Sequence, residues 1–522
     1  MLISKLTGQA PCPCCAYAHA QQVLPFAPFR SLTRWVTGLS GSPATVAKPA
    51  LPAAMRLEGV TVVDPRTGGK QRGMTVSISH GRITDIHPDG TKDHPSGVQV
   101  IEAKGKFLVP GYNDMHSHVL ELDDPSGSLG LMLAHGVTGF RQMSGSSALL
   151  AARRAGMLPI PADQPALLEA PGALITPFNA GSAEAVAEEI RRQKREGADF
   201  IKVALVAPDV FFAAIEAANV TGIPILGHLQ EGTDALDATA AGFRSVEHLG
   251  PGSTVFIACS DEEAELRADS YRREFIKAPP FRIPGLETLV MRRLGKMLIN
   301  PSAFANPADV ERLRRAIGSY STAKAKDMAA RFRDDGSWHC PTLVRLRTQE
   351  YADSEEYQND EMLAYLPPKA VKNWQEVTAK FKALPQEMRK VYREAYPRQL
   401  ELAGLLGEAG VRMIAGTDGG SFLGPGLSLP QEFKELSLAG FSPLAILQMT
   451  TINAAEYLGR TDSMGLVEIG YEADMVLLDA DPMDRVENLH SIAGVIRGGH
   501  WHSAERLGEM RRRVAETRGL LN

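Results

Sequence analysis

Cysteine, net charge and long apolar runs are all scarce in this sequence of 522 residues. Five cysteines in so long a chain do not make a disulfide scaffold, so we expect a reducing compartment, the cytoplasm. No stretch approaches the ~20 apolar residues that span a bilayer, which argues against a membrane partner. A net charge of −5 provides no broad basic surface, which argues against a nucleic-acid partner.

Several common motifs are also missing. The sequence contains neither G-x-x-x-x-G-K-[ST] nor G-x-G-x-x-G, so it lacks the usual glycine-rich loops that bind phosphates. It has no G-x-S-x-G elbow for a nucleophilic serine. With 44% hydrophobic and 22% charged residues, the composition is that of a globular protein, and the length suits a large catalytic domain with a smaller companion. The expected partner is a small-molecule substrate.

The first 57 residues contain no aspartate or glutamate and keep no helical or strand period. Prolines and Gly8 interrupt the start too often for the apolar core of a secretory signal. We expect residues 1–54 to form an irregular arm. Two alternatives stay open, a transit peptide and a zinc site formed by Cys12, Cys14, Cys15 and His19.

Short β-rich segments separated by turn residues occupy both ends of the remaining sequence. One set falls within residues 55–106, and the other, which includes GYEADMVLLDADP, falls within residues 461–505. We predict that both ends contribute strands to one small, discontinuous β-sandwich domain. Residues 506–522 would follow it as a tail or a helix.

Residues 107–460 alternate apolar strand-like runs with helical segments, the pattern of parallel β/α architecture. One clean helix, GSAEAVAEEIRRQKREG, has Ser182 as its expected N-cap and Gly197 as its stop. Two long insertions, residues 253–337 and 345–410, are placed to cover the barrel mouth. The pattern predicts an α/β fold with a (β/α)8 TIM-like barrel. Its expected strands are Phe107–Met115, Val137–Met143, Ala166–Glu169, Ala198–Leu205, Ile223–His228, Arg244–Glu247, Trp338–Val344 and Arg412–Gly416.

Metal-binding residue types recur at the carboxyl ends of these strands, the end where barrel enzymes carry out their chemistry. His116 and His118, two residues apart on an extended strand, can bind one ion from the same side. Taken singly, each such residue is more often a hydrogen-bonded structural residue or a turn former. Together they favour a metal site built from His116, His118, Lys202, His228, His248 and Asp418.

The same residues carry a resemblance to a known family. VPGYNDMHSH resembles the opening motif of the amidohydrolase superfamily, PG-x-x-D-x-H-x-H, and a lysine on strand four, GH on strand five, EH on strand six and GTD on strand eight follow in order. The segments LPQEFKELSLAGFSPLAILQMTTINAAEYLG and GLVEIGYEADMVLLDADP are similar to the imidazolonepropionase-like and Xaa-Pro-dipeptidase-like branch. The resemblance covers residues 55–503 and implies a metal-dependent amidohydrolase.

The resemblance implies a centre of two divalent metal ions. His116, His118 and Asp418 would hold one ion, and His228 and His248 would hold the second. Lys202 would bridge them as a carbamate, because burial favours the neutral amine that takes up carbon dioxide. A lysine that forms an ion pair at the strand end is the alternative. Imidazole and carboxylate ligands suit zinc best, with manganese, cobalt and iron as alternatives.

The resemblance also implies a reaction. A metal-bridging hydroxide would attack a carbonyl, and Asp418 would act as the catalytic base and then the acid. We expect hydrolysis of an amide bond in a small carboxylate-bearing substrate, either a dipeptide or an N-acyl amino acid. Hydrolysis of a cyclic amide or a lactone, deamination, and a non-catalytic scaffold are the alternatives. A homo-oligomer is expected from the family.

Four other chemically capable residues are given structural roles. His135 precedes the second strand and His339 begins the seventh, both away from the catalytic face. Cys259 and Cys340 have no histidine partner at catalytic spacing and are expected to be buried thiols. Gln142 stands where aspartate is common in the family, so the substrate pocket is expected to differ.

Overall fold

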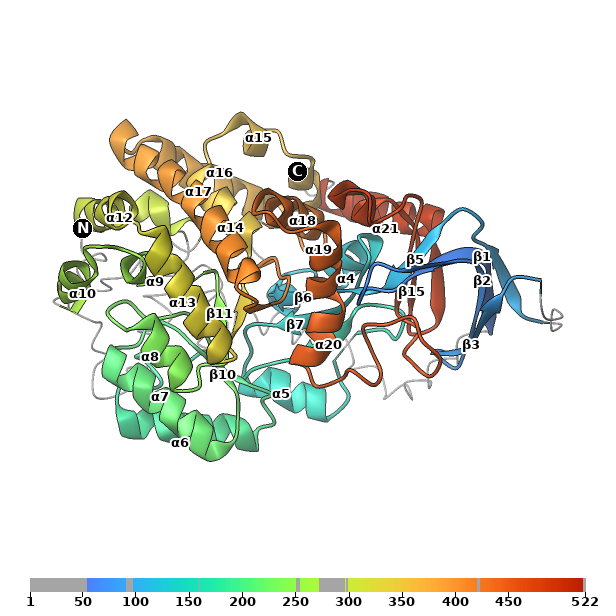
Figure 1. Ribbon diagram of the computed structural model, residues 1–522, viewed down its shortest axis with the longest axis horizontal. Coiled ribbons are helices and arrows are strands. Elements are labelled where there is room, and N and C mark those ends of the chain that lie inside the picture. Colours follow the sequence, from blue (N-terminus) through green and yellow to red (C-terminus); the bar gives the residue numbers. More distant parts are fainter. Residues whose placement is uncertain are drawn as a thin grey trace.

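The computed structural model describes residues 54–90, 97–158, 160–249, 254–271, 296, 299–419 and 423–519. The predicted arm lies outside these residues except for Ala54, so the zinc site at Cys12, Cys14, Cys15 and His19 stays a prediction. Figure 1 shows the barrel strands and their helices on one side of the molecule and a sheet built from both chain ends on the other.

Both chain ends contribute strands to one mixed sheet. Its order is β16-β15-β14-β5-β1-β2-β3, with β4 also paired to β1. The two ends meet where β14 pairs antiparallel to β5, with Val476 opposite Val109. The β-sandwich and the domain boundaries stay predictions. The strands are β1 (Met55–Val63), β2 (Lys70–Ser79), β3 (Arg82–Pro88), β4 (Gln99–Glu102), β5 (Phe107–Pro110), β14 (Met475–Leu478), β15 (Ile492–Arg497) and β16 (His500–Ser503).

The middle of the chain forms two parallel sheets of the TIM-barrel type, one with the order β6-β7-β8 and one with the order β13-β12-β11-β10-β9. Parallel bridges join them at both edges, Ser117 to Gly419 and Ile175 to Val203. The coarse prediction of an α/β barrel is therefore confirmed. The strands are β6 (Tyr112–Ser117), β7 (Val137–Gln142), β8 (Ala166–Glu169), β9 (Ile201–Val203), β10 (Ile225–Gly227), β11 (Ser245–Glu247), β12 (Trp338–Cys340) and β13 (Arg412–Met413).

The predicted first strand, Phe107–Met115, is wrong as a single element. The chain divides at Gly111 into β5, which belongs to the terminal sheet, and β6, which opens the barrel. A Cβ at Gly111 would lie 2.1 Å from Thr138 Oγ1, so the two sheets approach each other at a point where only glycine fits. A continuous apolar run in the sequence does not reveal that its two halves belong to different sheets.

Helices follow most barrel strands and cover the barrel. The helix predicted between Ser182 and Gly197 is confirmed as α6, and Ser182 Oγ accepts from the Ala185 N–H at 3.2 Å. A buried cluster inside the barrel, which includes Met115, Leu226 and Ile414, joins side chains from different strands. The covering helices are α4 (Pro125–Ala134), α5 (Ser147–Arg154), α6 (Ala183–Arg195), α7 (Pro208–Thr221), α8 (Ala235–Ala240), α13 (Thr322–Asp334), α18 (Ser428–Leu438), α19 (Pro443–Thr450) and α20 (Ile452–Tyr457).

The described parts of both insertions are helical. A buried apolar cluster, including Val344, Trp374 and Phe381, packs the second insertion against the first. The insertion elements are α9 (Thr254–Ala258), α10 (Glu263–Tyr271), η2 (Pro301–Phe304), α12 (Pro307–Gly318), α14 (Leu343–Glu350), α15 (Glu355–Gln358), η3 (Glu361–Tyr365), α16 (Pro368–Lys382) and α17 (Gln386–Glu408).

Three further elements lie outside the barrel and the insertions. They are η1 (Val119–Glu121), η4 (Val486–His490) and the C-terminal helix α21 (Ala504–Gly519), which packs against α4 and η3. Among the described residues, none of the helices has the length and apolar content needed to cross a membrane.

Candidate metal centre

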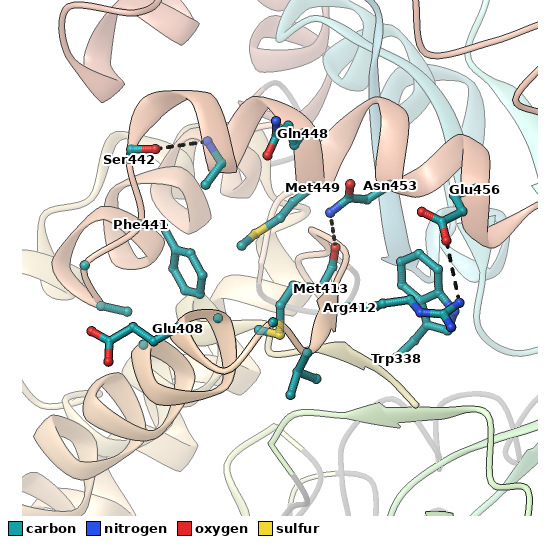
Figure 2. Close-up of a pocket in the computed structure, with 17 residues that line it drawn as sticks. Trp338, Glu408, Arg412, Met413, Phe441, Ser442, Gln448, Met449, Asn453 and Glu456 are labelled. Atoms are coloured by element: carbon teal, nitrogen blue, oxygen red, sulfur yellow. Dashed lines mark hydrogen bonds and ion pairs between the residues drawn. The ribbon is translucent and has the colours of Figure 1, made fainter. Parts of the chain in front are cut away.

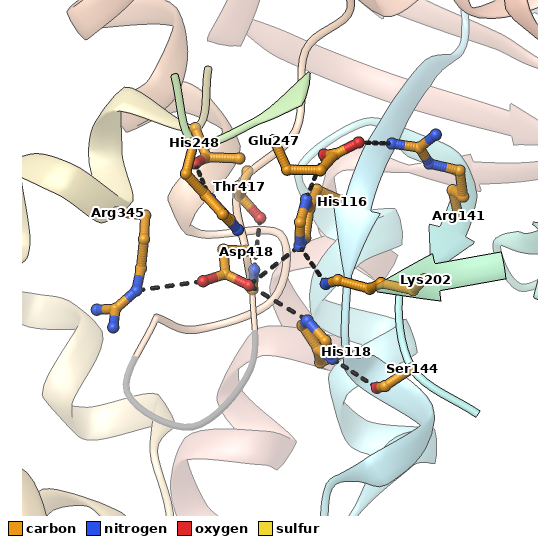
Figure 3. Close-up of polar contacts among 12 residues, drawn as sticks. His116, His118, Arg141, Ser144, Lys202, Glu247, His248, Arg345, Thr417 and Asp418 are labelled. Carbon is orange, nitrogen blue, oxygen red and sulfur yellow. Dashed lines mark hydrogen bonds and ion pairs between the residues drawn. The ribbon is translucent and has the colours of Figure 1, made fainter. Parts of the chain in front are cut away.

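The six residues of the predicted site lie at the carboxyl ends of the barrel strands. His116 is on β6, with His118 just past its end, and Lys202 is on β9. His228 and His248 directly follow β10 and β11, and Asp418 lies in the segment after β13. All six side chains are buried, with at most 6% of each residue exposed. Figure 3 shows five of them, His116, His118, Lys202, His248 and Asp418, gathered around one point, with His116 and His118 coming from the same strand or its end.

His116, His118 and Asp418 form the tightest group. Their candidate ligand atoms all lie within 4.8 Å of one another, the spacing that a single ion requires. Asp418 Oδ1 lies 3.3 Å from His116 Nε2 and 3.2 Å from His118 Nε2. Lys202 Nζ adds a further nitrogen 3.3 Å from His116 Nε2.

His228 and His248 lie beside this group. Their ring centroids are 5.1 Å apart, and the His248 ring is 4.5 Å from that of His116. The residues predicted to hold a second ion are therefore adjacent to those predicted to hold the first, with Lys202 close to both. Of the six predicted residues, those whose ligand atoms lie within 4.8 Å of one another in the described structure are His116, His118 and Asp418.

In three of the histidines, the Nδ1 atom contacts an oxygen of a neighbouring side chain. His116 Nδ1 lies 2.6 Å from Glu247 Oε2, and a carboxylate acceptor there keeps the proton on Nδ1. His118 Nδ1 is 2.7 Å from Ser144 Oγ, and His248 Nδ1 is 2.6 Å from Thr342 Oγ1. These contacts orient the rings, and in His116 they leave Nε2 with its lone pair toward the centre.

Glu247 is itself held by a buried arginine. Arg141 Nη2 donates to Glu247 Oε1 at 2.9 Å, and Arg141 Nε donates to the Met115 carbonyl at 2.6 Å. Arg141 also lies over the Tyr457 ring, 4.7 Å from its centroid. Burial would raise the pKa of Glu247, but the charges of Arg141 and His116 outweigh it and hold that pKa far below its usual value. Glu247 therefore stays an anion behind His116.

Backbone conformation at the strand ends is unusual. His248, Thr342 and Asp418 have φ values of 59°, 45° and 57°, the left-handed region that non-glycine residues seldom adopt. Asp114 braces the last of these, because its carboxylate accepts from the Thr417 N–H at 3.1 Å and from Thr417 Oγ1 at 2.7 Å. Strained residues held in this way are concentrated at functional sites.

The protonation states of His116, His228, His248 and Asp418 suit metal binding, whereas burial would lower the pKa of His118 but its contacts with Asp418 and Glu121 outweigh it and raise that pKa. Burial, and then the charge of Lys202, lower the pKa of both His116 and His228, and burial with His116 lowers that of His248. Burial would raise the pKa of Asp418, but contacts with His116 and His118 outweigh it and lower that pKa well below its usual value. Neutral imidazoles and an ionised carboxylate are the ligand forms that divalent metals bind.

Among the described residues, two of the candidate ligand atoms also lack the hydrogen bonds that buried polar atoms normally make, as expected of atoms that bind a metal ion. His118 Nε2 and Asp418 Oδ1 are buried 3.2 Å apart, but neither atom forms a hydrogen bond of good geometry within the described part of the chain. Buried polar atoms without partners are costly, and both of these face the shared space. Imidazole nitrogen and carboxylate oxygen are the ligand types of zinc, manganese, cobalt and iron.

Contacts made by Glu247, Arg141, Ser144 and Thr342 were not anticipated from the sequence. The EH motif offered a signal for Glu247, since a carboxylate beside a metal-binding histidine often orients another one. Arg345, 3.2 Å from Asp418 through its Nε, was not anticipated either, and its sequence neighbourhood carries no signal for this contact.

The other chemically capable residues have partners of their own, and one of them, Cys340, borders the centre. His135 Nδ1 is 2.9 Å from His490 Nε2, and the centroids of the His339 and Phe332 rings are 4.7 Å apart, with the rings tilted by 50°. Cys259 and Cys340 are buried free thiols. Cys340 lies close to His116 and Glu247, so it is nearer the centre than expected. Gln142 accepts from the Leu120 N–H at 3.2 Å, which steadies the loop after His118.

A separate cavity of about 470 Å³ lies at the amino-terminal end of β13 (Figure 2). Trp338, Arg412, Phe441, Asn453 and Glu456 are among its lining residues. None of the six predicted metal residues lines it. We assign the chemistry to the buried cluster of ligands and not to this cavity, because the cavity lies at the end of the strand opposite Asp418.

Comparison with curated proteins gives short matches. An adenine deaminase of Paracoccus denitrificans is 36% identical over 94 residues, 18% of this chain and 16% of the deaminase. A dihydroorotase of Carboxydothermus hydrogenoformans is 39% identical over 80 residues, 14% of this chain and 18% of the dihydroorotase. The matched stretches thus span less than a fifth of these relatives.

Solved structures share the fold over most of the chain. A bottromycin amidohydrolase has a TM-score of 0.63 at 22% identity, covering 96% of each chain. A Xaa-Pro dipeptidase with bound methionine has a TM-score of 0.55 at 15% identity, covering 86% of this chain and all (100%) of that one. At these identities the likeness shows the fold.

The family comparison covers a later part of the chain. Residues 296–502 match the model of the amidohydrolase family. This stretch contains Asp418 and ends within the terminal sheet. Dipeptidases are represented among the solved structures of the same fold. The family match and the shared fold together confirm the resemblance of this chain to the amidohydrolase superfamily.

Proposed function

We propose that this protein is a metal-dependent hydrolase that cleaves an amide bond in a small, carboxylate-bearing substrate, a dipeptide or an N-acyl amino acid. One observation carries the proposal: Asp418 lies some 300 residues after His116 and His118 in the sequence, yet the three present buried ligand atoms within 4.8 Å of one another at the catalytic end of a barrel. An amidohydrolase-family match and dipeptidase-like folds support the reaction class.

The proposed centre holds two divalent ions, with zinc as the first choice. His116, His118 and Asp418 would bind one ion, and His228 and His248 the other. We propose that Lys202, 1% exposed, carries a carbamate whose two oxygens each bind one ion. Bound divalent ions would lower the pKa of a water molecule and polarise the substrate carbonyl.

Asp418 is the proposed catalytic residue. Its carboxylate is ionised, because its pKa lies well below the usual range through contacts with His116 and His118 that outweigh its burial. Oδ1 faces the two imidazoles, so it is the oxygen placed to take a proton from the attacking water and return it to the leaving amine. Glu247 keeps the His116 ring in place during this transfer.

Two other reactions have specific support. The short matches to adenine deaminases favour release of ammonia from a ring, and the match to a dihydroorotase favours a cyclic amide. Lactone hydrolysis would use the same attack geometry. A non-catalytic scaffold is the least favoured candidate, because nothing but a functional site accounts for six buried ligand side chains at one end of the barrel.

The experiment is a substrate screen with zinc-, manganese- or cobalt-loaded protein. Dipeptides and N-acyl amino acids form one panel, and adenine, a cyclic amide and a lactone form the other. We expect turnover in the first panel, lost on chelation and restored by metal. Turnover restricted to the second panel would change the substrate class and leave the site in place. A protein that binds no divalent metal would favour the scaffold.

The remaining assignments are proposals that rest on composition and resemblance. We propose a cytoplasmic homo-oligomer that acts on a small molecule, with no nucleic-acid or membrane partner. We also propose a catalytic barrel over residues 107–460, inserted into a β-sandwich from residues 55–106 and 461–505.

A further inference from the structure

Arg345 is a buried cation beside the proposed catalytic carboxylate. It lies in α14, the helix that follows β12, and is 1% exposed. Its Nε is 3.2 Å from Asp418 Oδ2, the oxygen that does not face the imidazoles. Figure 3 shows Arg345 on the side of Asp418 opposite His118.

The guanidinium is fixed from behind as well. Arg345 Nη2 donates to the Ile299 carbonyl at 3.1 Å. With its amide oriented to match its neighbours, Gln349 places its oxygen 3.2 Å from both Nη2 and Nε of Arg345. Gln349 is one helical turn further along α14, so the helix itself supports the arginine.

These contacts give the two carboxylate oxygens of Asp418 different neighbours. Oδ2 is held by the guanidinium, while Oδ1 lies 3.2–3.3 Å from the two imidazoles. A carboxylate without a contact on Oδ2 could rotate about its own axis and exchange the two oxygens. A planar guanidinium, with several donors in a fixed arrangement, prevents that rotation better than a single point charge.

We infer that Arg345 is a positioning residue that sets the orientation of the Asp418 carboxylate in the metal centre. The inference rests on the proposed function, because it assigns Oδ1 to the metal side. Arg345 acts through Asp418, whose Oδ2 it contacts at 3.2 Å. Its removal is expected to misplace a ligand without removing it.

The test uses Co²⁺-loaded full-length protein, whose visible absorption reports the arrangement of the ligands around the ion. The variants are Arg345→Met, which removes the charge at similar length, and Arg345→Lys, which keeps a charge but not the planar set of donors. Arg347→Met is the matched control, since Arg347 lies on the same helix and pairs with Glu435 at 3.2 Å instead.

We expect Arg345→Met to bind Co²⁺ with an altered spectrum and to lose ~10²-fold in kcat on the substrate that the screen identifies, with KM changed far less. Arg345→Lys should lose about tenfold, and Arg347→Met should match the wild type. Wild-type spectrum and kcat in folded Arg345→Met would overturn the inference. If that variant does not fold, the same result in Arg345→Lys would overturn it.

Failure of this inference can be told apart from failure of the proposed function. A wild-type protein that takes up no Co²⁺ and hydrolyses no substrate contradicts the proposed function before any variant is made. A wild type that binds the ion, together with Arg345 variants that leave its spectrum unchanged, contradicts only the positioning role.

Discussion

At the scale of single residues, three histidines of the candidate metal centre are oriented by a contact that their Nδ1 atom makes on the side away from the centre. The Nδ1 atom of His116 contacts Glu247 Oε2, that of His118 contacts Ser144 Oγ, and that of His248 contacts Thr342 Oγ1, each at 2.6–2.7 Å. Anchored rings lose little freedom when an ion binds, so the site is preorganised. The proposed chemistry would therefore rest on the six predicted ligands and on the residues that hold them in place.

Asp418→Asn tests the proposed catalytic residue. The amide keeps the size of the carboxylate and one oxygen ligand, so the variant should retain some metal, but it cannot accept the proton. We expect kcat to fall by ~10²- to 10⁴-fold. Steady-state kinetics with metal analysis would check this, with Asp479→Asn, a mostly exposed carboxylate, as the control. Near wild-type turnover would remove Asp418 from the role.

Lys202→Ala tests the bridging carbamate. Loss of the bridge leaves the two ions poorly neutralised, so the variant should lose most activity and at least one metal per chain. Elemental analysis gives the metal count, and Lys194→Ala, an exposed lysine on α6, serves as the control. A crystal structure with an unmodified Lys202 amine paired to a carboxylate, beside a single ion, would contradict the carbamate.

At the scale of elements, α18 and α14 meet around a buried carboxyl. Glu432 Oε2 accepts from the Val344 N–H at 2.7 Å, and the residue is 0% exposed. Burial raises the pKa of Glu432 to about 8, against the opposing backbone hydrogen bonds. The carboxyl group is therefore mostly protonated at neutral pH.

The pH dependence of stability follows from this shift. Between the unfolded pKa of ~4.3 and the folded pKa of about 8, the native state holds a proton that the unfolded state has released. The contribution of Glu432 to the free energy of unfolding is therefore fully present below pH ~4.3 and is lost as the pH rises toward 8. Glu432→Gln mimics the protonated form and should stabilise the protein by on the order of 2 kcal/mol at pH 8.5, and by much less at pH 5.

Urea unfolding at the two pH values would measure this difference. Glu472→Gln is the control, because its carboxylate is partly exposed and paired with Arg460. An equal effect of Glu432→Gln at both pH values would show that Glu432 does not titrate as described.

The C-terminal helix α21 holds the start of α4 through one side chain. Arg518, 5% exposed, donates to Ser128 Oγ at 2.9 Å, to Asp124 Oδ2 at 3.2 Å and to the Tyr365 carbonyl. Arg518→Ala removes the donor to the buried Ser128 Oγ and the ion pair with Asp124, and should cost ~1–3 kcal/mol of unfolding free energy. Thermal and urea unfolding would check it against Arg506→Ala, an exposed arginine on the same helix. Equal stability of both variants would exclude this role for Arg518.

Local pattern was enough to predict the α/β barrel and to put the candidate ligand residues at the ends of its strands. His116, Lys202 and Asp418 sit at strand ends, and strand alternation is a local signal that the sequence carries. The anchors were not predictable in the same way, because Arg141 and Glu247 are 106 residues apart and meet only in the folded barrel. The division of the first strand at Gly111 escaped prediction since it depends on Thr138 of the neighbouring strand.

At the scale of the whole molecule, segments from the chain ends pack against the barrel, which lies between them in the sequence. β14 pairs with β5 immediately before the barrel begins, and α21 packs against α4 immediately after its first strand. The segment that carries His116 and His118 is thus held on both sides by elements from the C-terminal part of the chain. This arrangement gives the metal centre a rigid first strand.

Metal content per chain tests the central claim most directly. The protein would be loaded with zinc, passed through a desalting column and measured by elemental analysis, beside His118→Ala treated identically. The account predicts about two zinc ions per wild-type chain and a clear loss in the variant. Wild-type protein that retains no divalent metal under any loading condition, or a variant that retains as much as the wild type, would contradict it.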